Sequence, residues 1–182
     1  FYYKYFTKAI FFYKIKKNIN LILETKKVLF VCLGNICRSP AAEAIMLKKI
    51  QENSIENAFF VDSAGTGDWH VGNLADSRMR QAALKRGIDI KSRARQISTE
   101  DFENFDYILT MDKKNLDAIN KIYTKLNLSN SLVIKPLLSF SNNLNISEVP
   151  DPYFGGEDGF DYVLNLLDNA IENFLKDIFF KD

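Results

Sequence analysis

One short stretch limits the possible folds more than any other part of the chain. Residues 28–31 (Val-Leu-Phe-Val) are continuously apolar, which predicts a buried strand of a parallel sheet. Gly34 and Asn35 then tolerate the positive φ of a curled loop. Ser39 is the expected N-cap and Pro40 the first residue of a helix. A strand, a curled loop and a helix N-terminus together predict a binding site for an anion.

The remainder of the chain alternates short apolar runs with helical patterns. We expect strands at 58–62, 107–110 and 132–134, and helices at 39–53, 76–86, 112–119 and 159–179. This alternation predicts an α/β fold, a parallel sheet with helices on both faces. Ligands of such sheets bind at the carboxyl ends of the strands, where the first loop lies.

Composition limits the classes of partner and compartment. The 182 residues are 47% apolar, which suits one domain, and the net charge of +1 gives no reason to expect a nucleic acid partner. No apolar run is long enough to cross a bilayer, so no membrane association is expected. Only Cys32 and Cys37 are present, which argues against a disulfide framework. We therefore expect a reducing, cytoplasmic location and a chemical use for at least one thiol.

Residues 1–26 differ from the rest in composition. They are rich in Phe, Tyr, Lys, Ile and Asn, contain no acidic residue before Glu24 and do not begin with Met. A basic aromatic membrane-surface segment and a degenerate signal peptide are two interpretations. The simpler one is upstream sequence or a variable extension without a role. We expect residues 1–26 to lie outside the fold and residues 27–182 to form the domain.

Cys32 and Arg38 frame the predicted anion loop in a Cys-x5-Arg pattern. A cysteine ionises more readily beside a cation and at a helix N-terminus, and the thiolate is the nucleophile. The fork of Arg38 matches two phosphoryl oxygens, and the N–H groups of residues 33–38 can take the remaining charge. In-line attack by Cys32 would form a phosphocysteine and expel an alcohol or phenol, with no metal or other cofactor required.

The leaving oxygen needs a proton, and Asp151 is the candidate donor. It lies between Pro150 and Pro152, which hold its carboxylate on a stiff turn. The same group would then serve as base for the water that attacks the phosphoenzyme. Ser39 can donate a hydrogen bond to the sulfur and ease its departure.

Three further features admit more than one interpretation. Trp69 follows a loop of small residues near the same edge of the sheet, and is either a core anchor or a wall of the pocket. His70 projects from the same loop near the anion site, and is expected to be a surface residue rather than a catalytic base. The basic run 93–96 is expected to be a solvated face.

Several segments are similar to the low-molecular-weight protein tyrosine phosphatase family. They are residues 31–40, 62–66, 95–97, 107–112 and 151–153, within a region from about Lys27 to the C-terminus. The resemblance implies a single flavodoxin-like domain with a four-stranded parallel sheet. It also implies Cys32 as nucleophile, Arg38 as phosphate binder and Asp151 as general acid.

The same resemblance assigns supporting roles. Asn35, Ser39 and Ser63 would brace the loop, and Trp69 and Tyr153 would wall a slot for the substrate ring. The phosphate would be surrounded by Leu33, Gly34, Asn35, Ile36, Cys37 and Ser39. A deep slot would favour phosphotyrosine over the shorter phosphoserine. The implied enzyme is a protein tyrosine phosphatase that acts on phosphotyrosine-containing proteins as a monomer or weak dimer.

Three alternatives remain to be compared. Arsenate reductases of similar fold use the same loop, but they need a further pair of cysteines that this chain lacks. Arginine phosphatases of the same family carry Thr where Ile36 stands, and Ile36 favours an aromatic substrate. A silent phosphate-binding module finds no support, because the nucleophile, the phosphate binder and the acid are all present.

Cys37 either forms a protective disulfide with oxidised Cys32 or is a small buried filler.

Overall fold

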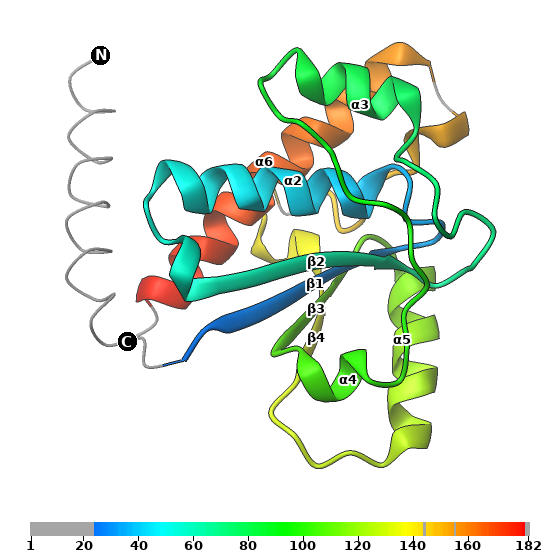
Figure 1. The fold of residues 1–182 in the computed structure, drawn as a ribbon, viewed down its shortest axis with the longest axis vertical. Helices are drawn as coiled ribbons and strands as arrows, with labels where there is room; N and C mark the ends of the chain where they lie inside the picture. The colour runs from blue at the N-terminus through cyan, green and yellow to red at the C-terminus, as the bar shows by residue number, and fades with distance from the viewer. Residues whose placement is uncertain (1–23, 144, 155, 181–182) are drawn as a thin grey trace.

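The computed structural model describes residues 24–143, 145–154 and 156–180, and its centre is one parallel sheet (Figure 1). The strands lie in the order β2-β1-β3-β4, and all three pairings are parallel. Their bounds are β1 (Lys26–Cys32), β2 (Phe59–Gly65), β3 (Tyr107–Thr110) and β4 (Val133–Pro136). The predicted four-stranded α/β sheet is confirmed. The proposed extension, residues 1–26, lies outside the described residues except for its last three.

Helices cover both faces of the sheet, as predicted. In Figure 1, α2 and α6 lie on one face, and α4 and α5 lie on the other. The helices are α2 (Arg38–Glu52), α3 (Ser77–Leu84), α4 (Asp101–Asn104), α5 (Lys113–Leu126) and α6 (Glu157–Phe180), with short 3-10 turns η1 (Glu56–Ala58), η2 (Leu137–Phe140) and η3 (Pro152–Phe154). No helix in the described part of the chain is both long and apolar enough to cross a membrane.

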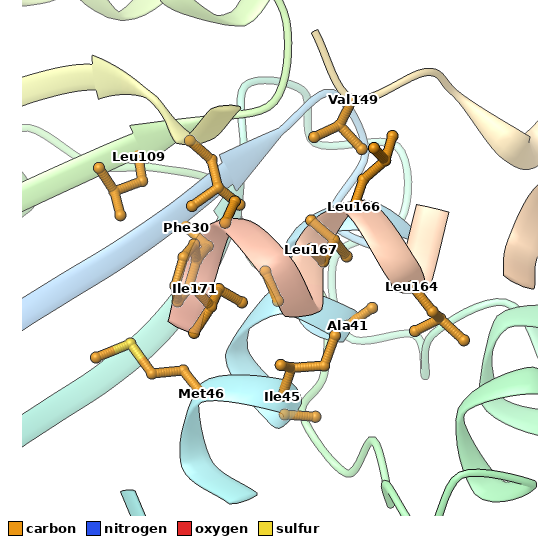
Figure 2. Close-up of a cluster of buried hydrophobic side chains, with 14 of the residues drawn as sticks. Phe30, Ala41, Ile45, Met46, Leu109, Val149, Leu164, Leu166, Leu167 and Ile171 are labelled. Atoms are coloured by element: carbon orange, nitrogen blue, oxygen red, sulfur yellow. The ribbon is translucent and has the colours of Figure 1, made fainter. Parts of the chain in front are cut away.

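β1 is the centre of the core, because its side chains alternate between the two faces. Val28 and Phe30 belong to the larger apolar cluster with α2 and α6, whereas Leu29 and Val31 belong to the smaller cluster with α4 and α5. All four side chains are fully buried. Figure 2 shows Phe30 of β1 beside Met46 of α2 and Ile171 of α6. The strand that ends at Cys32 is thus held rigidly from both sides.

Two predicted helix boundaries were wrong. α2 begins at Arg38 with Cys37 at the N-cap position and no side-chain cap, so Ser39 lies within the first turn. The hydroxyl of Ser39 is directed back to the loop, where it has other partners. α5 continues past Ile119 to Leu126, because Ile122 and Leu126 pack against the smaller apolar cluster. Polar residues between Ile119 and Leu126 made this apolar stripe hard to recognise in the sequence.

Candidate active site

The loop between β1 and α2 is curled and held from outside. Asn35 has a φ of 53°, the left-handed conformation expected from the sequence. Neighbouring backbone N–H groups bind three of the carbonyls: Thr66 donates to Cys32 at 2.9 Å, Gly67 to Leu33 at 2.9 Å, and Asp76 to Ile36 at 2.8 Å. These bonds hold the loop in one conformation.

Gly65, at the end of β2, permits this close approach. A Cβ at this position would lie 2.9 Å from the carbonyl oxygen of Leu33 and 3.2 Å from the backbone nitrogen of Asn35. Both atoms belong to the backbone, so neither can move aside cheaply. The two strand ends can therefore meet only where one of them carries no side chain.

The sulfur of Cys32 lies at the point where the strand turns into the loop. Its side chain is buried, and the Sγ atom is 3.0 Å from the Oγ of Ser39. The backbone N–H of Asn35 donates to the same sulfur at 3.3 Å. When Cys32 is a thiolate, both neighbours can donate hydrogen bonds to the negative charge on the sulfur.

The side chain of Asn35 connects the loop to the rest of the fold. Its Nδ2 donates to the Oγ of Ser39 and to the Oγ of Ser63, both at 2.9 Å. Its Oδ1 accepts from the backbone N–H of Arg95 at 2.9 Å. Both amide hydrogens and the amide oxygen therefore have partners, although Asn35 is buried.

These contacts limit the groups to which Ser39 can donate. The Oγ of Ser63 donates its single hydrogen to the Oε2 of Glu43 at 2.6 Å, so it accepts from Asn35. Ser39 likewise accepts from Asn35, and its own hydrogen remains for the sulfur of Cys32 or for the carbonyl of Ala64 at 3.3 Å. The sulfur is the nearer of the two acceptors. The hydroxyl of Ser39 can therefore donate either to the candidate nucleophile or to the carbonyl of Ala64.

Glu43 closes this network on the far side from the sulfur. Burial raises the pKa of its carboxyl group, and hydrogen bonds with Ser63 and Ser92 act in the opposite direction. The sequence showed Glu43 only as a residue of a helix. No sequence signal pointed to its contact with Ser63, because the two residues meet only when α2 packs on β2.

The guanidinium of Arg38 is buried between two carboxylates. Its Nη1 donates to the Oδ2 of Asp112 at 2.7 Å and to the carbonyl of Val149 at 3.2 Å, and its Nη2 donates to the Oδ2 of Asp151 at 2.8 Å. Asp112 was predicted only as the cap of α5, a role that its Oδ1 fills by accepting from Asn115 at 2.7 Å. Its position just after β3 was the available signal for a second role at the strand ends.

A slot of about 160 Å³ opens above Cys32. Cys32, Arg38 and Asp151 all line it, although they come from three distant parts of the sequence. The remaining lining residues are Leu33, Gly34, Ile36, Cys37, Trp69, His70 and Tyr153. The slot thus brings the predicted nucleophile, anion binder and acid together. Asn35, Ser39 and Ser63 are not among its lining residues, and their side chains bond one another beside it.

Two aromatic side chains stand at the mouth of the slot. Trp69 is 68% exposed and Tyr153 is 42% exposed, so Trp69 is a wall of the slot and not a core anchor. His70 lies near the anion loop, as predicted, and lines the slot instead of standing apart on the surface. It is half-buried in the wall, and its Cδ2 would lie 3.0 Å from a Cβ placed on Gly34. The turn that follows Trp69 carries His70 back over the loop.

Cys37 is buried in the same loop. Burial raises the pKa of its thiol to about 12, and the carboxylate of Asp76 adds to this effect. At neutral pH its side chain is therefore a neutral thiol. Both cysteines are free in this structure, which leaves the protective disulfide a prediction.

A family model described as low molecular weight phosphotyrosine protein phosphatase matches residues 27–181. The chain belongs to this family. A low molecular weight phosphotyrosine protein phosphatase of Schizosaccharomyces pombe is 45% identical over 155 residues, which cover 84% of this chain and 96% of the relative. Family members are protein phosphatases, hydrolases whose substrates are phosphoproteins.

Solved structures agree with this assignment. A protein tyrosine phosphatase from Entamoeba histolytica has a TM-score of 0.78 and 42% identity, covering 85% of this chain and 97% of that one. A Drosophila arginine phosphatase has a TM-score of 0.82 and 35% identity, covering 86% and 99%. The predicted family and fold are therefore confirmed.

Ser92 also takes part in the network that holds the loop. Here Ser92 forms a hydrogen bond with Glu43, and the amide oxygen of Asn35 is bound by the N–H of Arg95. The loop asparagine is therefore fully bonded without an imidazole.

Among the described residues, no group of three or more His, Cys, Asp and Glu side chains is arranged to hold a metal ion.

Arg95 shows why the prediction of a solvated basic face was wrong for this residue. Its guanidinium bridges Asp62, with Nε at 2.9 Å, and Asp101, with Nη1 at 2.9 Å. Burial alone would lower its pKa, but the carboxylates of Asp101 and Asp62 outweigh burial and raise it. The ion pairs thus fix the backbone segment of the phosphatase whose N–H binds Asn35.

Proposed function

We propose that this protein hydrolyses phosphotyrosine in proteins through a phosphocysteine intermediate on Cys32. The observation that carries the proposal is the convergence of Cys32, Arg38 and Asp151 in one narrow slot. Each of the three has a neighbour that suits its role. The sulfur receives hydrogen bonds, the guanidinium is held by Asp112, and the acid lies on a stiff turn.

In the first step the thiolate of Cys32 attacks phosphorus in line with the ester oxygen. An S–P bond forms and the P–O bond to the phenol breaks, while Asp151 gives its proton to the leaving oxygen. The phosphoryl oxygens replace Asp151 as acceptor of the hydrogen bond from the Nη2 of Arg38. Asp112 keeps its hydrogen bond with Nη1. Binding of the dianion therefore frees Asp151 to face the leaving group.

In the second step a water molecule attacks the phosphocysteine. Asp151, now a carboxylate, takes a proton from the water as the new P–O bond forms. The S–P bond breaks and the electron pair returns to sulfur. The hydroxyl of Ser39, 3.0 Å from the sulfur, stabilises the departing thiolate, and inorganic phosphate is released.

The walls of the slot favour an aromatic ester. Trp69, Tyr153 and Ile36 present apolar surface beside a floor of polar groups, which suits a phenyl ring carrying a phosphate. The arginine phosphatase among the similar structures makes phosphoarginine the second candidate substrate. Ile36 in the slot supports phosphotyrosine instead. A ratio of kcat/KM for phosphotyrosine over phosphoarginine peptides above one is expected, and a ratio below one would favour the alternative.

The organisation of the whole chain is part of the proposal. The family match over residues 27–181 supports a catalytic domain spanning residues 27–182, preceded by an extension outside it. The use of a free thiol as nucleophile supports a reducing, cytoplasmic compartment. We propose that the enzyme works as a monomer or weak dimer on phosphotyrosine-containing proteins.

Replacement of the nucleophile tests the proposal. Cys32→Ser should lower kcat for p-nitrophenyl phosphate and for phosphotyrosine peptides by at least about a thousandfold, because a serine hydroxyl is not ionised at neutral pH. A circular dichroism spectrum matching the wild type would show that the fold is kept. Activity that survives the substitution, or that a metal chelator abolishes in the wild type, would contradict the mechanism.

A further inference from the structure

A second hollow adjoins the catalytic slot. It is a groove of about 540 Å³ between the N-terminus of α5 and the segment 148–151. Leu33, Arg38 and Asp151 line both the slot and the groove. Leu33 is 47% exposed, although it is apolar and lies in the catalytic loop. A polypeptide whose phosphotyrosine fills the slot can therefore continue over Leu33 into the groove.

The charged groups around the groove differ in whether they already form an ion pair or a hydrogen bond within the protein. The Nζ of Lys113 is paired with the Oδ2 of Asp117 at 2.8 Å, and Asp112 is paired with Arg38. The Oε1 of Glu148 accepts the backbone N–H of Lys113 at 3.1 Å, where the N-terminus of α5 favours a negative charge. Lys114 is exposed and forms no ion pair within the described part of the chain.

We propose that this groove binds the segment of the phosphoprotein substrate next to the phosphotyrosine, with a carboxylate of that segment on Lys114. The inference rests on the proposed function and adds to it a preference for an acidic neighbour. The volume is in the range of ligand sites, and Leu33 and Pro150 give the groove an apolar stretch for the peptide chain. Lys114 supplies a positive charge that forms no ion pair with any of the described residues.

Peptides that differ only beside the phosphotyrosine test this inference. A series carries Asp, Ala or Lys at each of the three positions on either side, and kcat/KM is measured at low salt. The wild type should prefer Asp over Lys at one or more positions by about fivefold, the upper range for an exposed ion pair. Lys114→Glu should invert this preference, and added salt should weaken it in both proteins.

Two controls separate this inference from the proposed function. Lys121→Glu changes the same charge on an exposed residue farther along α5 and should keep the wild-type preference. Hydrolysis of p-nitrophenyl phosphate, which has no flanking segment, should stay within about twofold in both variants, because exposed charges contribute little. If Lys114→Glu keeps the wild-type preference while the small ester is hydrolysed, the groove is not the subsite. Loss of all activity in the wild type would instead refute the proposed function.

Discussion

Glu43 lies in α2, but the environment of its carboxyl group differs from that of an ordinary glutamate on a helix surface. Its carboxyl group is hydrogen-bonded to Ser63, and through Asn35 and Ser39 it is connected to the sulfur of Cys32. Burial raises its pKa above the ordinary value of 4.5. The ionised form is therefore less favourable in the folded protein than in the unfolded chain, and the network includes a built-in dependence on pH.

Glu43→Gln should remove this dependence. In the wild type the unfolded chain loses the Glu43 proton near 4.5 while the folded protein still keeps it. The contribution of Glu43 to stability is thus present below pH 4.5 and is lost as the pH rises through the folded pKa. The free energy of unfolding, measured by urea titration between pH 4 and 8, should fall with pH more steeply in the wild type than in the variant.

Glu52→Gln is the matched control for this measurement. Glu52 is exposed in the same helix, and its carboxylate lies 3.9 Å from the Nζ of Lys48, a distant contact. Glu52→Gln should show the same slope of unfolding free energy against pH as the wild type. Parallel pH curves for the wild type and Glu43→Gln would show that Glu43 does not titrate differently in the folded state.

Among the helices, α3 connects two parts of the site through its first residues: the loop that carries Cys32 and the turn that carries Asp151. The backbone N–H of Asp76 binds the carbonyl of Ile36 in the loop. The side chain of Asp76 binds the fork of Arg78, with Nη2 at 2.8 Å, and this contact lowers the pKa of Asp76. Arg78 in turn donates to the carbonyl of Tyr153 at 3.3 Å and lies 5.3 Å from the centre of its ring. Asp151 is thus positioned relative to Cys32 through α3.

Arg78→Ala should therefore impair proton donation more than phosphate binding. We expect kcat for phenyl phosphate, a poor leaving group, to fall about tenfold, because a small displacement of a catalytic group is costly. The kcat for p-nitrophenyl phosphate, whose leaving group needs little protonation, should fall much less. Asp151→Ala should show the same pattern in stronger form, and Arg78→Lys should recover part of the loss.

Arg80→Ala is the control from the same helix, since Arg80 donates to the carbonyl of Ala75 and has no part in the slot. It should leave the ratio of the two rates at the wild-type value. If Arg78→Ala slowed both esters equally, Arg78 would act on the loop that carries Cys32 and not on Asp151.

For the whole molecule, the sequence predicted the placement of strands and site residues correctly where a contiguous stretch of residues encodes it. The strand, loop and helix around Cys32 form one local pattern, and Asp151 lies in a short Pro-Asp-Pro turn. The alternation of apolar runs was sufficient for the parallel sheet. Each of these predictions depended on local geometry and on the rule that strand ends meet at one edge.

The features that were missed arise from contacts between distant segments. Glu43 meets Ser63 across α2 and β2, Asp112 meets Arg38 from the end of β3, and Arg95 bridges Asp62 and Asp101. Each of these residues looked like an ordinary charge on a helix, cap or loop. Periodicity does not show which charges packing will bury, so the partners became visible only in the fold.

The central claim is a covalent phosphocysteine on Cys32, and trapping it is the most direct test. The enzyme is mixed with p-nitrophenyl phosphate, quenched with acid within milliseconds and digested, and the peptides are analysed by mass spectrometry. We predict one phosphoryl group on the peptide that contains Cys32, formed together with a burst of one p-nitrophenol per enzyme. Turnover at the full rate with no phosphoryl group on Cys32, or with the group on another residue, would contradict this account.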